Sequence, residues 1–252
     1  MILNNDFIKT HITSDKFETI NIAGDKVVEY KPVPYRWTHG ATEKHIGDGL
    51  LIYTIIQLMR YKSVVCLGSG GGFIPRIMTQ ARMDLHKQGI FEGDEDYNWG
   101  DIGTTYLVDA ANGVGGKVSY LDKESYFRYQ FCPRFINETT ENAYYNFFVK
   151  QDIKIDFLHI DAGHSYEDVK QDFDLYSKLL SENGIISIHD TDETFQKELI
   201  VTEDEREYYE LFDGPPKFIK EIGPEWKQFN FFNTGQLRSK PSSTGITLLQ
   251  RA

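Results

Sequence analysis

The segment from Ile155 to Asp190 constrains the fold more than any other part of the chain. It reads IDFLHIDAGHSYEDVKQDFDLYSKLLSENGIISIHD: an apolar run, a short loop, an amphipathic stretch, an Asn-Gly turn and a second apolar run. Such a pattern predicts two parallel strands joined by a crossover helix. Because ligands bind where the carboxyl ends of parallel strands meet, we expect Asp161, His164 and Asp190 to lie together at one edge of the sheet.

The stretch between these two strands has the pattern of a capped helix. Ser165, followed three residues later by Asp168, is typical of a capping box, and Asn183-Gly184 is typical of a helix end. We expect the acidic residues of this helix to form its solvated face: Glu167, Asp168, Asp172 and Asp174. His159 and Ile188 lie inside the strands and are expected in the core.

The same alternation continues on both sides of this segment. The expected strands span residues 63–67, 105–109, 134–136, 228–232 and 245–249, and the expected helices span about 43–61, 72–88 and 121–131. Strands that alternate with helices imply an α/β fold with a parallel sheet and right-handed crossovers.

The chain is long enough for one large domain, because its 252 residues are 40% hydrophobic and contain no internal repeat. We interpret residues 1–42, which are of mixed polarity, as an N-terminal lid or edge segment, and residues 43–252 as the domain. Residues 88–103 are interpreted as an inserted loop and residues 195–226 as a second lid.

Charge and composition argue against several classes of partner. The formal net charge of -11 repels phosphate backbones and no run of Lys and Arg offsets it, so no nucleic-acid partner is expected. No apolar stretch has the length of a membrane span, and the N-terminus lacks the apolar run of a signal peptide. Cys66 and Cys132 are too few for a disulfide framework or a thiolate zinc site. We expect a cytoplasmic protein without a membrane partner, and a homo-oligomer stays open.

A glycine-rich loop, Gly68-Ser69-Gly70-Gly71-Gly72, lies between an expected strand and an expected helix. Glycines allow positive φ and a close approach of the backbone to a ligand, and the amides of a helix start can bind its polar groups. A tight turn without a ligand is the alternative. A dinucleotide fingerprint would need glycine at position 73, which is Phe73. Asp109, ending the next strand, is suited to ribose hydroxyls, or is an ordinary strand-end carboxylate.

With GxGxG after the first strand and an acid ending the second, residues 43–252 resemble the class I S-adenosylmethionine-dependent methyltransferases. The resemblance implies a Rossmann-like, doubly wound, seven-stranded and mostly parallel sheet with a reversed C-terminal hairpin. It also implies which residues bind S-adenosylmethionine: Gly68, Ser69, Gly70, Gly72 and Asp109. The family often has an acid two residues before the first glycine, where this chain has Cys66.

The stretch IDAGHSYE resembles the IDGxHSYE-type segment of a branch related to sugar and macrolide O-methyltransferases. That resemblance implies methyl transfer to a hydroxyl of a sugar, including a nucleotide-activated sugar for capsule or glycan assembly. It implies a divalent metal, Mg²⁺ or Mn²⁺, on Asp161 and Asp190. His189 stands where relatives can carry a second acid and is the expected third ligand, with Asp192 ranked below it.

The chemistry of methyl transfer suits these residues. An alcohol is a poor nucleophile, and a metal that holds it lowers its pKa and orients it. A base then removes the proton, and His164 has an ordinary pKa suited to that role. We therefore take His164 and Asp161 as candidate catalytic residues. The alternatives are a loop histidine packed on the helix for His164 and strand-end hydrogen bonds for Asp161 and Asp190.

Three other functions stay open: a dinucleotide-dependent oxidoreductase, a non-catalytic S-adenosylmethionine-binding protein, and methyl transfer without a metal. The expected partner is a small molecule, which in this interpretation is contacted by aromatic and basic residues of the lid segments. These are Tyr35, Trp37, Tyr97, Trp99 and Trp226 for stacking, and Arg36, Lys217 and Arg238 for a diphosphate.

Overall fold

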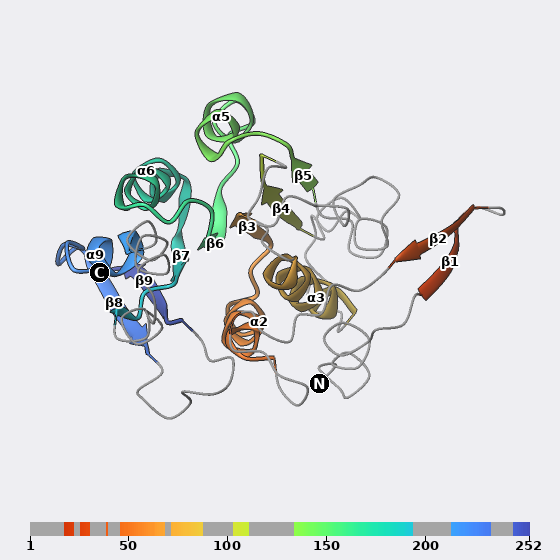
Figure 1. Cartoon of the computed structure of the whole chain (residues 1–252), viewed down its shortest axis with the longest axis horizontal. Coiled ribbons are helices and arrows are strands. Elements are labelled where there is room, and N and C mark those ends of the chain that lie inside the picture. The colour runs from red at the N-terminus through yellow and green to blue at the C-terminus, as the bar shows by residue number, and fades with distance from the viewer. Residues whose placement is uncertain are drawn as a thin grey trace, which may run out of the picture.

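The computed structural model describes residues 18–22, 26–30, 39, 46–68, 72–87, 103–110, 134–193, 213–232 and 244–252. Within them, seven strands form one sheet in the order β5-β4-β3-β6-β7-β9-β8 (Figure 1). The strands are β3 (Ser63–Leu67), β4 (Thr104–Val108), β5 (Arg134–Ile136), β6 (Ile155–Ile160), β7 (Leu180–His189), β8 (Trp226–Phe231) and β9 (Ile246–Arg251). The pairs among β3 to β7 are parallel, whereas β9 pairs antiparallel with β7 and β8. The predicted α/β fold with a reversed C-terminal hairpin is confirmed.

Helices cover both faces of this sheet (Figure 1). One face carries α2 (Asp48–Met59) and α3 (Phe73–Lys87), and the other carries α5 (Thr140–Ala143), the π-helix η4 (Tyr144–Phe148), α6 (Tyr166–Tyr176) and α9 (Gly214–Ile219). Side chains alternate between the two cores: Val64 and Cys66 pack with α2 and α3, while Val65 and Leu67 pack with the other helices. The doubly wound arrangement is therefore confirmed.

Residues at the N-terminus form a sheet of their own. The strands β1 (Glu18–Ile22) and β2 (Lys26–Tyr30) pair antiparallel with each other. The predicted helix over 121–131, residues 88–102 of the expected insert and residues 194–212 of the expected second lid lie outside the described residues. The remaining part of that lid segment contains α9, whose Phe218 and Ile219 are buried against α6. In the described part of the chain, no helix combines the length and the apolar character needed to cross a membrane.

The predicted helix end at Asn183-Gly184 is wrong. Ser165 does cap α6, accepting a hydrogen bond from the Asp168 amide at 3.1 Å, but α6 ends at Tyr176. A 3-10 turn, η5 (Ser177–Leu179), follows, and β7 already begins at Leu180. Leu180 is buried and pairs with Ile155, so its burial against the sheet outweighs continuation of the helix.

Asp172 departs from the predicted solvated face of α6, because it is only 2% exposed. It faces α5, where Thr140 hydrogen-bonds its carboxyl group. Burial is the main cause that raises the pKa of Asp172 to about 7; the hydrogen bond with Thr140 opposes this shift, and the charge of Asp168 adds to it. Glu167, Asp168 and Asp174 are exposed as predicted.

We expect Asp172→Asn to stabilise the fold above about pH 7 and to change it little below about pH 4. An unperturbed aspartate carboxyl has a pKa of 3.8, whereas the pKa of Asp172 in the fold is about 7. The stability of the wild type is therefore fully present below the lower value and is lost as pH rises through the upper one. Thermal unfolding of both proteins across this pH range measures the effect. Asp174→Asn, at an exposed position two residues away, is the control. A difference in Tm that does not grow with pH would contradict the expectation.

Candidate active site

The site lies at the carboxyl ends of the parallel strands. Gly68 follows β3, Asp109 follows β4, Asp161 follows β6, and His189 ends β7 with Asp190 next. The expectation that these strand ends gather residues from distant parts of the chain is confirmed by the distances between their side chains.

An acidic edge forms around His164. Its Nε2 lies 2.9 Å from Oδ2 of Asp190 and 3.5 Å from Oδ1 of Asp161, and all three side chains are less than one fifth exposed. Burial lowers the pKa of His164, but the hydrogen bonds and charges of Asp161 and Asp190 outweigh it and raise the pKa to about 10. The contacts with histidines hold the pKa of both carboxyls well below their usual range, against the opposing effect of burial. His164 therefore donates to both carboxylates in this arrangement.

His189 also lies in this cluster, as the sequence predicts. Its Nδ1 is 3.3 Å from Oδ1 of Asp161 and 3.1 Å from Oδ1 of Asp190, and the side chain is 8% exposed. Burial lowers the pKa of His189, but the charges of Asp190 and Asp161 outweigh it and hold the pKa well above its usual value. On the other side of the ring, Nε2 lies 3.3 Å from Oγ1 of Thr244 and 3.6 Å from Oδ2 of Asp48.

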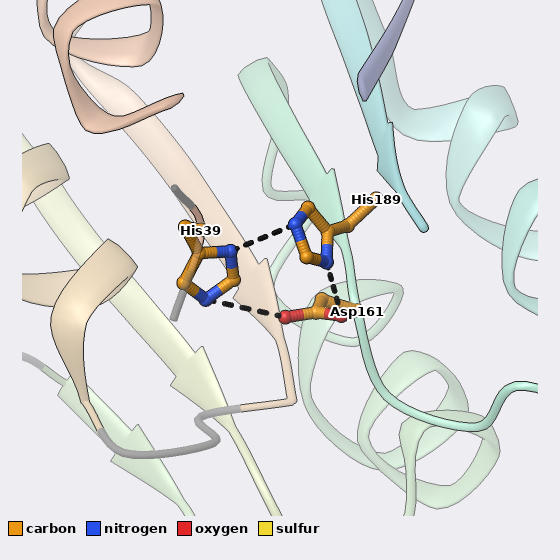
Figure 2. A group of neighbouring side chains, drawn as sticks. All are labelled: His39, Asp161 and His189. Carbon is orange, nitrogen blue, oxygen red and sulfur yellow. Dashed lines mark hydrogen bonds and ion pairs between the residues drawn. The ribbon is translucent and has the colours of Figure 1, made fainter. Parts of the chain in front are cut away.

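His39 joins the cluster from the N-terminal part of the chain, and the sequence reasoning missed it. Its Nδ1 lies 3.0 Å from Nε2 of His189, and its Nε2 lies 3.8 Å from Oδ2 of Asp161 (Figure 2). The ring stacks on Phe73, with 5.8 Å between centroids. Burial lowers the pKa of His39 to about 4, reinforced by neighbouring His189. A lone histidine more than a hundred residues from Asp161 belongs to no motif, so only the tertiary fold reveals it.

His159 is fully buried in β6, as predicted for a core residue. Its Nδ1 hydrogen-bonds Oγ of Ser187 at 2.8 Å on the neighbouring strand. Its Nε2 faces the site, 3.9 Å from Oδ2 of Asp161, and is without a hydrogen-bond partner among the described residues. This core histidine therefore lies next to the Asp161 carboxylate, on the buried side of the site.

The backbone at the end of β7 is held in an unusual conformation. Asp190 has a φ of 58°, a region that residues other than glycine rarely adopt, and such strain concentrates at functional sites. The hydroxyl of Thr244 donates to the Asp190 carboxylate. Gly245 has a φ of 93°, and a Cβ there would lie 2.4 Å from the backbone nitrogen of Asp192. The turn before β9 thus fixes the direction of the Asp190 side chain.

The residues present fit a divalent cation. In two groups, His39 with Asp161 and His189, and Asp161 with His164 and Asp190, one ligand atom per residue lies within 4.8 Å of the others. Carboxylate and imidazole are common ligands of divalent metals. The buried Nδ1 of His189 forms no well-aligned hydrogen bond in the described part of the chain, although carboxylate oxygens of Asp161 and Asp190 lie 3.3 and 3.1 Å away, so it is placed as a ligand atom would be.

Gly68, the first residue of the glycine loop, contacts the acidic edge directly. Gly68 has a φ of 81°, and a Cβ there would lie 2.1 Å from the carbonyl oxygen of Asp161. The amide of Asp161 in turn donates to the carbonyl of Leu67 at 2.9 Å. Gly72, at the other end of the loop, has a φ of 80°. The tight-turn interpretation therefore accounts for Gly68, and the same contact puts Gly68 beside Asp161.

Of the other residues expected to bind the methyl donor, some are described by the structure and some are not. Asp109 is 7% exposed at the end of β4, where it can meet a ligand of the glycine loop. Ser69 and Gly70 lie outside the described residues. Cys66, in place of the family's acid, is fully buried, and its Sγ donates to the Gly68 carbonyl at 3.1 Å. Burial raises the pKa of its thiol, so Cys66 supplies no negative charge to a ligand.

Two of the residues expected to meet an acceptor are described, and each contacts another part of the protein. Trp226 packs on Phe173 with 5.2 Å between ring centroids, as part of a core. Lys217 pairs with Asp213 on α9 at 2.5 Å. The other expected residues lie outside the described part of the chain: Tyr35, Arg36, Trp37, Tyr97, Trp99 and Arg238.

Comparison with known proteins identifies the family. Residues 65–191, from β3 to just past the acidic edge, match a family described as a methyltransferase domain. The chain belongs to this methyltransferase family. Its fold is that of the class I S-adenosylmethionine-dependent methyltransferases, and the dinucleotide-dependent oxidoreductase is excluded. No curated protein matches the chain by sequence.

Solved structures agree on the fold. The O-methyltransferase TomG from Streptomyces achromogenes, involved in tomaymycin synthesis and solved with S-adenosylmethionine, is 10% identical, with a TM-score of 0.57 over 85% of this chain and 82% of TomG. An O-methyltransferase from Bacillus cereus in complex with S-adenosylhomocysteine is 14% identical, with a TM-score of 0.56 over 85% and 84%. The S-adenosylhomocysteine-bound methyltransferase PaMTH1 from Podospora anserina is 16% identical, with a TM-score of 0.55 over 81% and 78%.

The start of α9 supports the loop that carries His164. The amide of Gly214 donates to the His164 carbonyl at 3.1 Å. A Cβ on Gly214 would lie 2.3 Å from the carbonyl carbon of Ser165 and 2.4 Å from the carbonyl oxygen of His164. Both contacts are with backbone atoms, so any side chain at this position must displace the loop.

We expect Gly214→Ala to lower kcat by about a hundredfold, because displacement of a catalytic group by an ångström can cost that much, while affinity for S-adenosylmethionine stays near wild type. Turnover of an active acceptor and calorimetric binding of S-adenosylmethionine measure the two effects. Gly223→Ala is the matched control, since a Cβ there would meet only the end of the Glu225 side chain. An unchanged kcat in Gly214→Ala would show that α9 does not position His164.

Proposed function

We propose that this methyltransferase transfers the methyl group of S-adenosylmethionine to a hydroxyl of a sugar, in particular a nucleotide-activated sugar used in capsule or glycan assembly. The observation that carries O-methyl transfer is the contact of Gly68 with Asp161. It puts a loop suited to the methyl donor beside a cluster of carboxylates and imidazoles suited to holding and deprotonating a hydroxyl.

The reaction is a displacement at the methyl carbon. The acceptor oxygen forms a bond to the methyl carbon as the sulfur–carbon bond breaks, and the sulfonium leaves as a neutral thioether. The hydroxyl proton must pass to a base within hydrogen-bond reach, and we assign this role to His164. Asp161 orients the acceptor and His164, while Gly68, Ser69, Gly70, Gly72 and Asp109 bind the donor.

We assign a divalent cation to Asp161 and Asp190, with His189 as a third ligand; when bound, it would lower the pKa of the acceptor hydroxyl. The short distances from Nδ1 of His189 to Oδ1 of Asp161 and Oδ1 of Asp190, 3.3 and 3.1 Å, support this assignment. Neutralisation of the two carboxylates would also remove the charges that hold a proton on His164, and so favours its action as a base.

The acceptor class rests on the likeness of IDAGHSYE to the segment of sugar and macrolide O-methyltransferases. The solved relatives with bound donor or product include enzymes described as O-methyltransferases, which supports a hydroxyl as the acceptor. A cytoplasmic location suits a nucleotide-activated acceptor.

We expect Asp161→Ala and His164→Ala each to lower kcat by at least about a hundredfold, because each removes a group that acts on the acceptor proton or oxygen. Affinity for S-adenosylmethionine should stay nearly unchanged, since the Gly68 contact uses only the backbone of Asp161. Release of S-adenosylhomocysteine and calorimetry measure the two quantities. Asp174→Ala, on the exposed side of α6, is the control. Loss of donor affinity with turnover retained would overturn the assigned roles.

A panel of nucleotide sugars, assayed for S-adenosylhomocysteine release with and without divalent metals, tests the acceptor and the cation. We expect turnover with a member of the panel and its loss in EDTA, restored by Mg²⁺ or Mn²⁺. A full rate in EDTA would exclude the metal. Tight binding of S-adenosylmethionine without turnover of any acceptor would instead favour a non-catalytic S-adenosylmethionine-binding protein.

A further inference from the structure

Besides His164, three imidazoles converge on the Asp161 carboxylate from separate parts of the fold. Nε2 of His39 and Nε2 of His159 lie 3.8 and 3.9 Å from its Oδ2, and Nδ1 of His189 lies 3.3 Å from its Oδ1. Their side chains are 10%, 0% and 8% exposed. A site made for Mg²⁺ alone would present oxygen atoms, because that ion prefers oxygen ligands.

The contact between His39 and His189 limits how their ring nitrogens can meet Asp161. Nδ1 of His39 and Nε2 of His189 lie 3.0 Å apart, and a hydrogen bond between them uses one proton. When both rings are neutral, the ring that donates has a bare nitrogen on its other side. In either direction of the bond, that bare nitrogen is one of the two that face Asp161 (Figure 2). A buried lone pair that faces a carboxylate is unfavourable, and a metal cation between the two satisfies both groups, as a second ring proton would.

Both imidazoles can serve the same ion. If His189 binds through Nδ1, its Nε2–H can turn from His39 to Oγ1 of Thr244 or Oδ2 of Asp48, which already lie 3.3 and 3.6 Å away. Metal-binding histidines commonly donate their other ring N–H to such a neighbour. His39 is then free to bind through Nε2, on the side that faces Asp161.

We propose that His39 is a metal ligand, and that His39, His189 and Asp161 select a transition-metal ion such as Mn²⁺, Fe²⁺ or Co²⁺ over Mg²⁺. The proposal rests on the metal site of the proposed function and names the class of its ion. Imidazole favours first-row transition metals, whereas carboxylate and water suit Mg²⁺. The ion would also connect residue 39, from the N-terminal part of the chain, to the carboxyl edge of the sheet.

Metal binding without any acceptor tests this proposal separately from the reaction. Full-length protein without a histidine tag is stripped with EDTA and titrated calorimetrically with Mn²⁺ and with Mg²⁺. Pulsed electron paramagnetic resonance of the Mn²⁺-loaded protein reports bound nitrogen. For the wild type we expect Mn²⁺ to bind at least about tenfold more tightly than Mg²⁺, with nitrogen coupling from two imidazoles.

Variants then identify the ligand. His39→Ala should lose one of the two nitrogen couplings and at least about tenfold in Mn²⁺ affinity, with little change for Mg²⁺. His39→Asp should restore Mn²⁺ binding through an oxygen ligand. It should also reduce the ratio of the Mn²⁺ affinity to the Mg²⁺ affinity. His86→Ala on α3 is the matched control, and circular dichroism checks that each variant is folded.

Measurements on the wild type can overturn the proposal even if a variant does not fold. Absence of nitrogen coupling, or equal affinity for Mn²⁺ and Mg²⁺, would overturn the proposal. So would a folded His39→Ala that retains both couplings. Each of these results leaves methyl transfer itself untouched, and a failure to find an acceptor would leave the binding result intact.

Discussion

The site depends on one backbone junction, where the turn after β3 meets the turn after β6. The Asp161 amide donates to the Leu67 carbonyl, and Gly68 passes so close to the Asp161 carbonyl that no side chain fits between them. Glycine is required at 68 by its φ of 81° as well as by this approach. Because of this junction, a loop suited to the methyl donor and the carboxylate suited to the acceptor are neighbours, and neither can move without the other.

Local sequence patterns predict the sheet well because each strand is defined by its own residues. The run from Ser63 to Leu67 is apolar, bounded by polar and glycine positions, and forms β3 over the predicted range. The end of α6 could not be predicted in this way. Leu179 and Leu180 continue the helical pattern, but the buried position of Leu180 beside Ile155 exists only once the sheet is assembled. The burial of Asp172 could not be predicted for the same reason, since its neighbour Thr140 belongs to another helix.

The residues of the site also fall into those that local sequence predicts and those that only the tertiary fold brings in. Asp161, His164 and Asp190 stand at strand ends within one continuous segment, so a topological argument brings them together. His39 reaches them by tertiary contact alone, with Phe73 against one face of its ring and His189 at its edge. Thr244, which orients Asp190, is likewise recognised only from the antiparallel pairing of β9 with β7. Sequence thus predicts the carboxylates of the site but not the groups that orient them.

Charge balance connects these groups to the chemistry. Asp161 and Asp190 carry two negative charges at a mostly buried edge. Two protons, on His164 and His189, can neutralise them, and so can one divalent ion held by neutral imidazoles. The two arrangements present the same net charge to a sulfonium donor. They differ in whether His164 carries the extra proton. With two protons, one of them is on His164, the residue to which we assign acceptance of the hydroxyl proton. A divalent ion would remove the charges that hold this proton, so the proposed metal and the proposed base depend on each other.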